Sequence, residues 1–156
     1  MKSILKIFIL CIIIIVTLFL WNEFPDLSFS KKINEELTNK NYLATVHNNI
    51  GELYQQMGEP EKALEYCFKG LKMRSEIGDK SGVAYSYNNI GMIYLKQKNP
   101  TAAKNVLQSS LSISKQTHEK PAMLEAYTAL ATADSMLGNY KDAFAHQKIY
   151  TALKDS

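Results

Sequence analysis

Apolar positions along the chain recur in steps of three and four, and the whole pattern returns every 40 residues. The segment NNIGELY at 48–54 comes back as NNIGMIY at 88–94 and, more weakly, as TALATAD at 128–134. Steps of three and four place apolar side chains on one face of an α-helix. A fixed period between 20 and 50 residues is typical of a solenoid. The pattern therefore predicts stacked helical pairs.

Each period contains two amphipathic segments. Gly51 and Gly91 lie on the apolar face of the first segment, where a small residue lets a second helix come close. Pro60 and Pro100 begin the second segment, where the first helical turn tolerates a missing N–H. The expected helical pairs are 41–57 with 60–77, 81–97 with 100–116, and 121–137 with 140–154.

A partial unit precedes the three pairs. Residues 28–40 match the second helix of a preceding pair and are expected to form a separate helix that caps the array, because each unit buries its apolar stripe only against neighbours. The predicted organisation is a leader at 1–22, a linker at 23–27, the capping helix, and repeats at 41–80, 81–120 and 121–156.

The repeated residues resemble those of the tetratricopeptide repeat family, whose usual unit of about 34 residues is shorter. Repeat one carries Ile50, Gly51, Tyr54, Gly58, Ala63 and Gly70. Repeat two carries Tyr87, Ile90, Gly91, Tyr94, Ala103 and Ser110. Repeat three carries Tyr127, Leu130, Ala131, Gly138, Tyr140 and Ala143 but has Asp134 where the family has tyrosine. The resemblance implies an all-α superhelix of three hairpins.

The same resemblance implies a peptide-binding groove lined by the first helix of each pair. The matching positions are Thr45, Asn48, Asn49, Glu52, Gln55, Tyr85, Asn88, Asn89, Met92, Lys96, Glu125, Thr128 and Thr132. Asparagine offers a donor and an acceptor, which suits a peptide backbone. Hydrogen bonds between neighbouring helices are the alternative role, and this role is expected of Asn49 and Asn89 more than of Asn48 and Asn88.

The leader is a separate, strongly apolar segment. Lys2 and Lys6 precede fifteen uncharged residues, Ile7 to Trp21, so residues 4–22 are just long enough to contact or span a membrane. An uncleaved anchor is preferred, because the residues that follow the run are bulky or charged, but a cleaved secretory signal stays open. Lysines on the N-terminal side orient the repeats outside the cytoplasm, in the periplasm of a bacterium with the anchor in the inner membrane.

Charge and chemistry exclude several classes of function. Without the two lysines of the leader, the chain has 16 basic and 15 acidic residues. The sequence shows no basic surface of the kind that binds nucleic acid. His47, His118 and His146 fall on unrelated positions, without the spacing of a metal site or a catalytic triad. Neither an enzyme nor a cofactor is expected.

The preferred hypothesis is therefore a non-catalytic module that binds a protein or peptide. The end of the chain, from Tyr150 to Ser156, resembles the last repeat of membrane-bound sensor kinases and regulators of the Bacteroidetes type, which implies a sensory or scaffolding role in signal transduction. A secreted assembly factor and the input part of a histidine kinase are the alternatives. Apolar residues of the last helix also suggest self-association.

Overall fold

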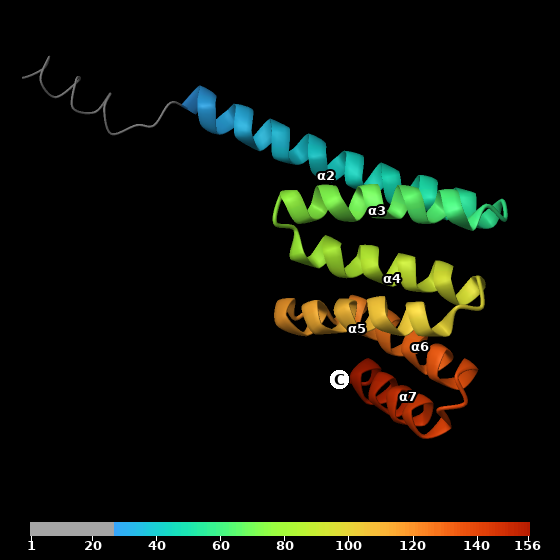
Figure 1. Cartoon of the computed structure of the whole chain (residues 1–156). Helices are drawn as coiled ribbons and strands as arrows, with labels where there is room; N and C mark the ends of the chain where they lie inside the picture. The colour runs from blue at the N-terminus through green and yellow to red at the C-terminus, as the bar shows by residue number, and fades with distance from the viewer. Residues whose placement is uncertain (1–26) are drawn as a thin grey trace, which may run out of the picture. The chain divides into compact units, whose positions relative to one another are not determined.

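The computed structural model describes residues 27–156, and every regular element in this range is an α-helix. Figure 1 shows the helices as a run of antiparallel neighbours from α3 onward. They are α2 (Leu27–Gln56), α3 (Pro60–Glu76), α4 (Lys80–Lys96), α5 (Pro100–Thr117), α6 (Lys120–Met136) and α7 (Tyr140–Lys154). The predicted all-α solenoid of three hairpins is confirmed.

Residues 39–156 form one compact unit, and the beginning of α2 belongs to another. The leader predicted at 1–22, and the linker as far as residue 26, lie outside the described residues. Within the described part of the chain, no helix has the length and apolarity needed to cross a membrane.

The start of the array differs from the prediction, because α2 runs without a break from Leu27 to Gln56. At the two later boundaries between repeats the chain turns through positive φ, at Gly78 (73°) and His118 (57°). The equivalent position before the first repeat is Thr38, and a β-branched residue strongly disfavours positive φ. The predicted capping helix and first helix therefore form one element.

Small residues allow the two helices of a hairpin to touch. A Cβ atom on Gly51 would lie 2.6 Å from Cys67 Sγ and 3.0 Å from the carbonyl oxygen of Ala63, and one on Gly91 would lie 2.6 Å from Leu107. A real Cβ atom essentially never comes as close as 2.6 Å to another heavy atom. The expectation that these glycines serve contact is confirmed.

The core consists of clusters that join one hairpin to the next. Ala63 and Cys67 of α3 pack with Ile90 and Ile93 of α4. A second cluster joins residues of α4 and α5 to those of α6: Leu95, Ala103, Leu107, Ala129, Leu130 and Ala133. Each hairpin therefore buries its apolar stripe against its neighbour, as a solenoid requires.

Asp134, which occupies the position of Tyr54 and Tyr94, is fully buried among three helices. Lys104 Nζ of α5 lies 2.5 Å from its Oδ1, and His146 Nδ1 of α7 lies 3.1 Å from its Oδ2. Asp134 Oδ2 and His146 Nδ1 make no hydrogen bond among the described residues. A buried carboxylate needs a cationic partner because its desolvation is costly, and Lys104 supplies it. The departure from the family pattern is thus compensated within the core.

We expect Lys104→Met to destabilise the fold by about 3 kcal/mol, because the Asp134 carboxylate then stays buried without its cation. The double substitution Lys104→Met with Asp134→Tyr should regain most of this loss, since it restores the aromatic residue of the other repeats. Urea denaturation followed by circular dichroism measures both. Lys62→Met, on an exposed ion pair with Glu59, is the control. Equal stability of Lys104→Met and Lys62→Met would contradict this role of the ion pair.

Burial raises the pKa of the Cys67 thiol to about 11 from 9.0, and the negative charge of Glu52 adds to the shift. Between pH 9 and 11 the unfolded chain releases this proton while the folded chain keeps it, so stability falls as the pH rises. From pH 8 to 11 we expect the wild-type protein to lose about 2 kcal/mol more than Cys67→Ala. Urea titrations at both pH values measure the difference, and equal losses would contradict the buried thiol.

Candidate functional site

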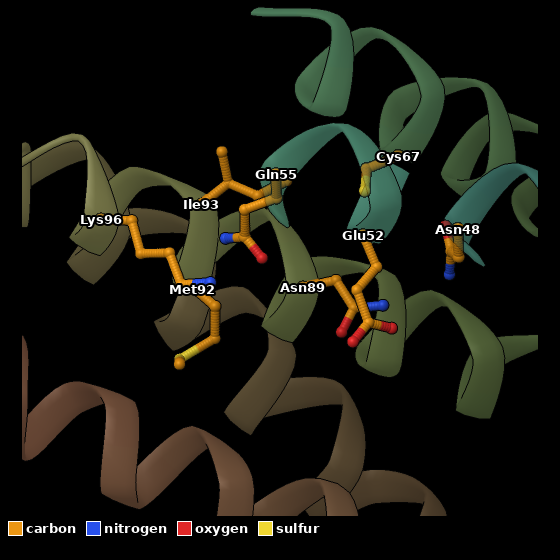
Figure 2. A pocket seen from close by; sticks show the side chains of 8 residues that line it. All are labelled: Asn48, Glu52, Gln55, Cys67, Asn89, Met92, Ile93 and Lys96. Atoms are coloured by element: carbon orange, nitrogen blue, oxygen red, sulfur yellow. The ribbon is translucent and has the colours of Figure 1, made fainter. Parts of the chain in front are cut away.

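Two adjoining cavities lie along the first helices of the hairpins. The first has a volume of about 270 Å³ between α2, α3 and α4, and Figure 2 shows the side chains around it. In that view the side chains of Glu52, from α2, and of Asn89, from α4, extend into the same region of the picture. Met92 and Lys96 also belong to α4. Its lining residues are Asn48, Glu52, Gln55, Cys67, Asn89, Met92, Ile93 and Lys96.

The second cavity, of about 420 Å³, lies between α4, α6 and α7. Its lining residues are Asn88, Asn89, Met92, Leu124, Glu125, Thr128, Ala129 and Tyr150. Asn89 and Met92 line both cavities. The two hollows are therefore parts of one groove that runs across three repeats.

Most of the predicted groove residues line one of these cavities. They are Asn48, Glu52, Gln55, Asn88, Asn89, Met92, Lys96, Glu125 and Thr128. Thr45, Asn49, Tyr85 and Thr132 line neither. The sequence pattern thus places most of its residues beside the cavities and four of them outside.

The predicted residues outside the cavities have other surroundings. Thr45 Oγ1 accepts a hydrogen bond from Arg74 Nη2 over 3.2 Å, and Thr132 Oγ1 donates to the carbonyl of Thr128 over 3.1 Å. Asn49 is exposed. Tyr85 is half-buried, and its pKa is raised first by desolvation and then by the negative charges of Glu119 and Glu125.

The two asparagines of each pair differ in their surroundings. The hydrogen bonds between neighbouring helices were predicted for Asn49 and Asn89, and this prediction was wrong. Asn48 and Asn88 are buried, with 6% and 2% of their surface exposed. Asn48 Nδ2 donates to Ser86 Oγ over 3.2 Å, and Asn88 Nδ2 donates to the carbonyl of Ala122 over 3.0 Å. These amides connect neighbouring first helices, whereas Asn49 and Asn89 are exposed.

Five lining residues escaped the sequence analysis: Cys67, Ile93, Leu124, Ala129 and Tyr150. Cys67 and Ile93 belong to the core, so only their edges reach the groove. The sequence could have indicated Leu124 and Tyr150. The 40-residue period aligns Leu124 with alanine, and Tyr150 with glycine or serine, in the other two repeats.

The groove is mixed in charge. Glu52 and Lys96 line the first cavity, and Glu125 is the charged residue of the second. With Lys96 as the one cation among these lining residues, the groove lacks the several basic side chains that recognition of a carboxylate terminus needs. Among the described residues, no group of three or more His, Cys, Asp or Glu side chains could hold a metal ion.

Comparison with known proteins agrees with this architecture. Two overlapping matches to the tetratricopeptide repeat family model cover residues 42–116 and 82–154. No curated protein matches the chain.

Several solved structures share the fold. The tetratricopeptide repeat domain of Arabidopsis FLU is 23% identical, with a TM-score of 0.69, and the match covers 74% of this chain and 98% of that one. BtubC (BKLC) from P. vanneervenii is 20% identical, with a TM-score of 0.70, and the match covers 82% of this chain and 54% of that one. Because the family model spans most of the sequence, the chain belongs to the tetratricopeptide repeat family.

Proposed function

We propose that the groove binds an extended peptide segment of a protein partner and that the chain acts as a non-catalytic interaction module. The observation that carries this proposal is the continuity of the two cavities through Asn89 and Met92. Together they run across three repeats on the wall formed by the first helices. Protein interaction is also the role that a tetratricopeptide repeat module suggests.

The polar groups of the groove suit a peptide backbone. Gln55 Nε2 is buried and makes no hydrogen bond to the described residues, although Gln55 lines the first cavity. A buried amide donor without a partner costs free energy, which a carbonyl group of a ligand would recover. Asn89 is exposed between the two cavities and offers a donor and an acceptor.

Peptides selected from a random display library against the full-length chain should depend on these two amides. We expect Gln55→Ala with Asn89→Ala to weaken their binding about tenfold or more, since each lost hydrogen bond costs about 1 kcal/mol. Fluorescence anisotropy with labelled peptides measures the affinity.

The matched control is Gln108→Ala with Asn49→Ala. Gln108 and Asn49 are exposed and line neither cavity, and Asn49 is the counterpart of Asn89 in the first repeat. Equal affinity of the two double variants, with unchanged circular dichroism, would contradict the groove as the binding site.

We further propose that residues 4–22 anchor the chain in an inner membrane, with the repeats in the periplasm as the sensory or scaffolding part of a signal-transduction system. The support is the sequence pattern of two lysines followed by an uncharged apolar run. A cleaved signal and a secreted assembly factor form the alternative.

Cell fractionation tests the anchor. The wild-type chain should sediment with membranes after a high-salt wash and keep its unprocessed mass. Ile13→Lys with Ile14→Lys should release it, because each lysine at the centre of a span costs about 3 kcal/mol. A shortened, soluble wild-type product would instead support the cleaved signal.

The predicted self-association through the C-terminal helix stays a prediction. The feature in its favour is the exposure of Tyr140 (71%) and Phe144 (73%) on α7. Phe144 occupies the repeat position of Leu64, which packs against the cluster that contains Ile90 and Ile93. A first helix from another hairpin would cover Phe144 in the same way.

A further inference from the structure

The third hairpin departs from the first two at one contact between its helices. In the first hairpin, a Cβ atom on Gly70 would lie 2.8 Å from the carbonyl oxygen of Ala44 and 2.5 Å from Asn48 Oδ1. In the second, Ser110 Oγ donates to the carbonyl of Ala84 over 2.8 Å. All these residues are buried, so small side chains close this contact completely.

The third hairpin has Leu124 and Tyr150 at these two positions. A tyrosine ring cannot occupy the place of Gly70, where even a methyl group would collide with the facing helix. Both side chains are instead half-buried, and both line the cavity of about 420 Å³. The loss of the small pair therefore places an apolar side chain and an aromatic one on the groove.

The cavity is lined by both apolar and polar residues. Met92, Leu124, Ala129 and Tyr150 supply apolar and aromatic surface. The volume lies within the range of about 300–1,000 Å³ that is usual for ligand pockets. The cavity thus has room for a large apolar side chain.

Glu125 supplies the charge among the lining residues. Its Oε2 atom accepts a hydrogen bond from Asn88 Nδ2 over 3.1 Å, and the residue is exposed. Lys154 Nζ lies 5.9 Å from the centroid of the Tyr150 ring but does not line the cavity. The charge beside the cavity thus complements a cation.

We propose that this cavity is an anchor subsite of the groove, which takes one large apolar side chain of the bound peptide and uses Glu125 to select a Lys or Arg residue beside it. The inference rests on the proposed peptide-binding function. It adds the chemistry of the ligand, namely a segment in which an apolar and a basic residue are neighbours.

The peptides selected by display provide the probes. We expect them to share a Leu, Met, Phe or Tyr residue next to a Lys or Arg residue. Tyr150→Ala should weaken their binding about tenfold, because a buried apolar contact of this size is lost. Tyr140→Ala is the matched control, since Tyr140 lies on the same helix and lines neither cavity.

Glu125 has a readout that a purely structural residue would not change. Replacing the basic residue of a selected peptide by Glu should weaken binding to the wild-type chain about three- to tenfold. The lower value is expected for a solvent-exposed ion pair and the higher one for a charge-assisted hydrogen bond. The Glu125→Lys variant should reverse this preference and favour the Glu-containing peptide. Glu76→Lys, an exposed site on α3, should leave it unchanged.

The outcomes separate the subsite from the groove. Peptides that lose affinity with Gln55→Ala and Asn89→Ala, but lack the apolar and basic pair or ignore Tyr150 and Glu125, would overturn the subsite and leave the groove standing. Peptides insensitive to all four residues would overturn both. A reversed charge preference in Glu125→Lys supports the subsite even where Tyr150→Ala is unstable.

Discussion

Close contact between the two helices of a hairpin is the constraint on which the structure depends. At Gly51 and Gly91 the facing helix comes so near that a single methyl group would collide with it. This contact fixes how each pair packs, and its return after 40 residues gives the first two pairs the same packing. First helices therefore follow one another along one wall, and the groove arises from that repetition. No loop of unusual length or composition is needed to form it.

A second repeated interaction sets the distance between neighbouring first helices. Asn48 bonds to Ser86 of α4, and Asn88 bonds to the carbonyl of Ala122 and to Glu125 of α6. A buried N–H donor cannot be left without an acceptor at low cost, so the Nδ2 group of each asparagine holds the next helix at hydrogen-bonding distance. The third repeat has Thr128 at this position. Its short side chain bonds to its own helix at the carbonyl of Leu124, so the series of amide bonds ends there.

Periodicity predicted the type of the elements and the pairing of the helices in the three hairpins, because burial of an apolar face dictates both. It failed where the outcome depends on side-chain direction. Asn48 and Asn49 are one residue apart, and a helical period alone cannot decide which of them turns toward the neighbouring helix. The continuity of α2 through Thr38 was missed for a related reason. At the later boundaries between repeats the helix ends before a residue with positive φ, Gly78 or His118, and the apolar pattern does not encode that.

Two departures from the repeat, Asp134 and Tyr150, lie in the third hairpin. Their consequences differ because neighbouring residues compensate for Asp134 but not for Tyr150. Asp134 replaces a tyrosine in the core, where Lys104 supplies the cation that a buried carboxylate requires. Tyr150 replaces a glycine or serine, and Leu124, the residue opposite, is larger as well, so no smaller partner restores the close contact. The larger side chains of Leu124 and Tyr150 do not fit between the two helices, and both line the groove. A sequence change that packing cannot absorb thus becomes a feature of the binding surface, which is why the second cavity is shaped by α7 as well as by the first helices.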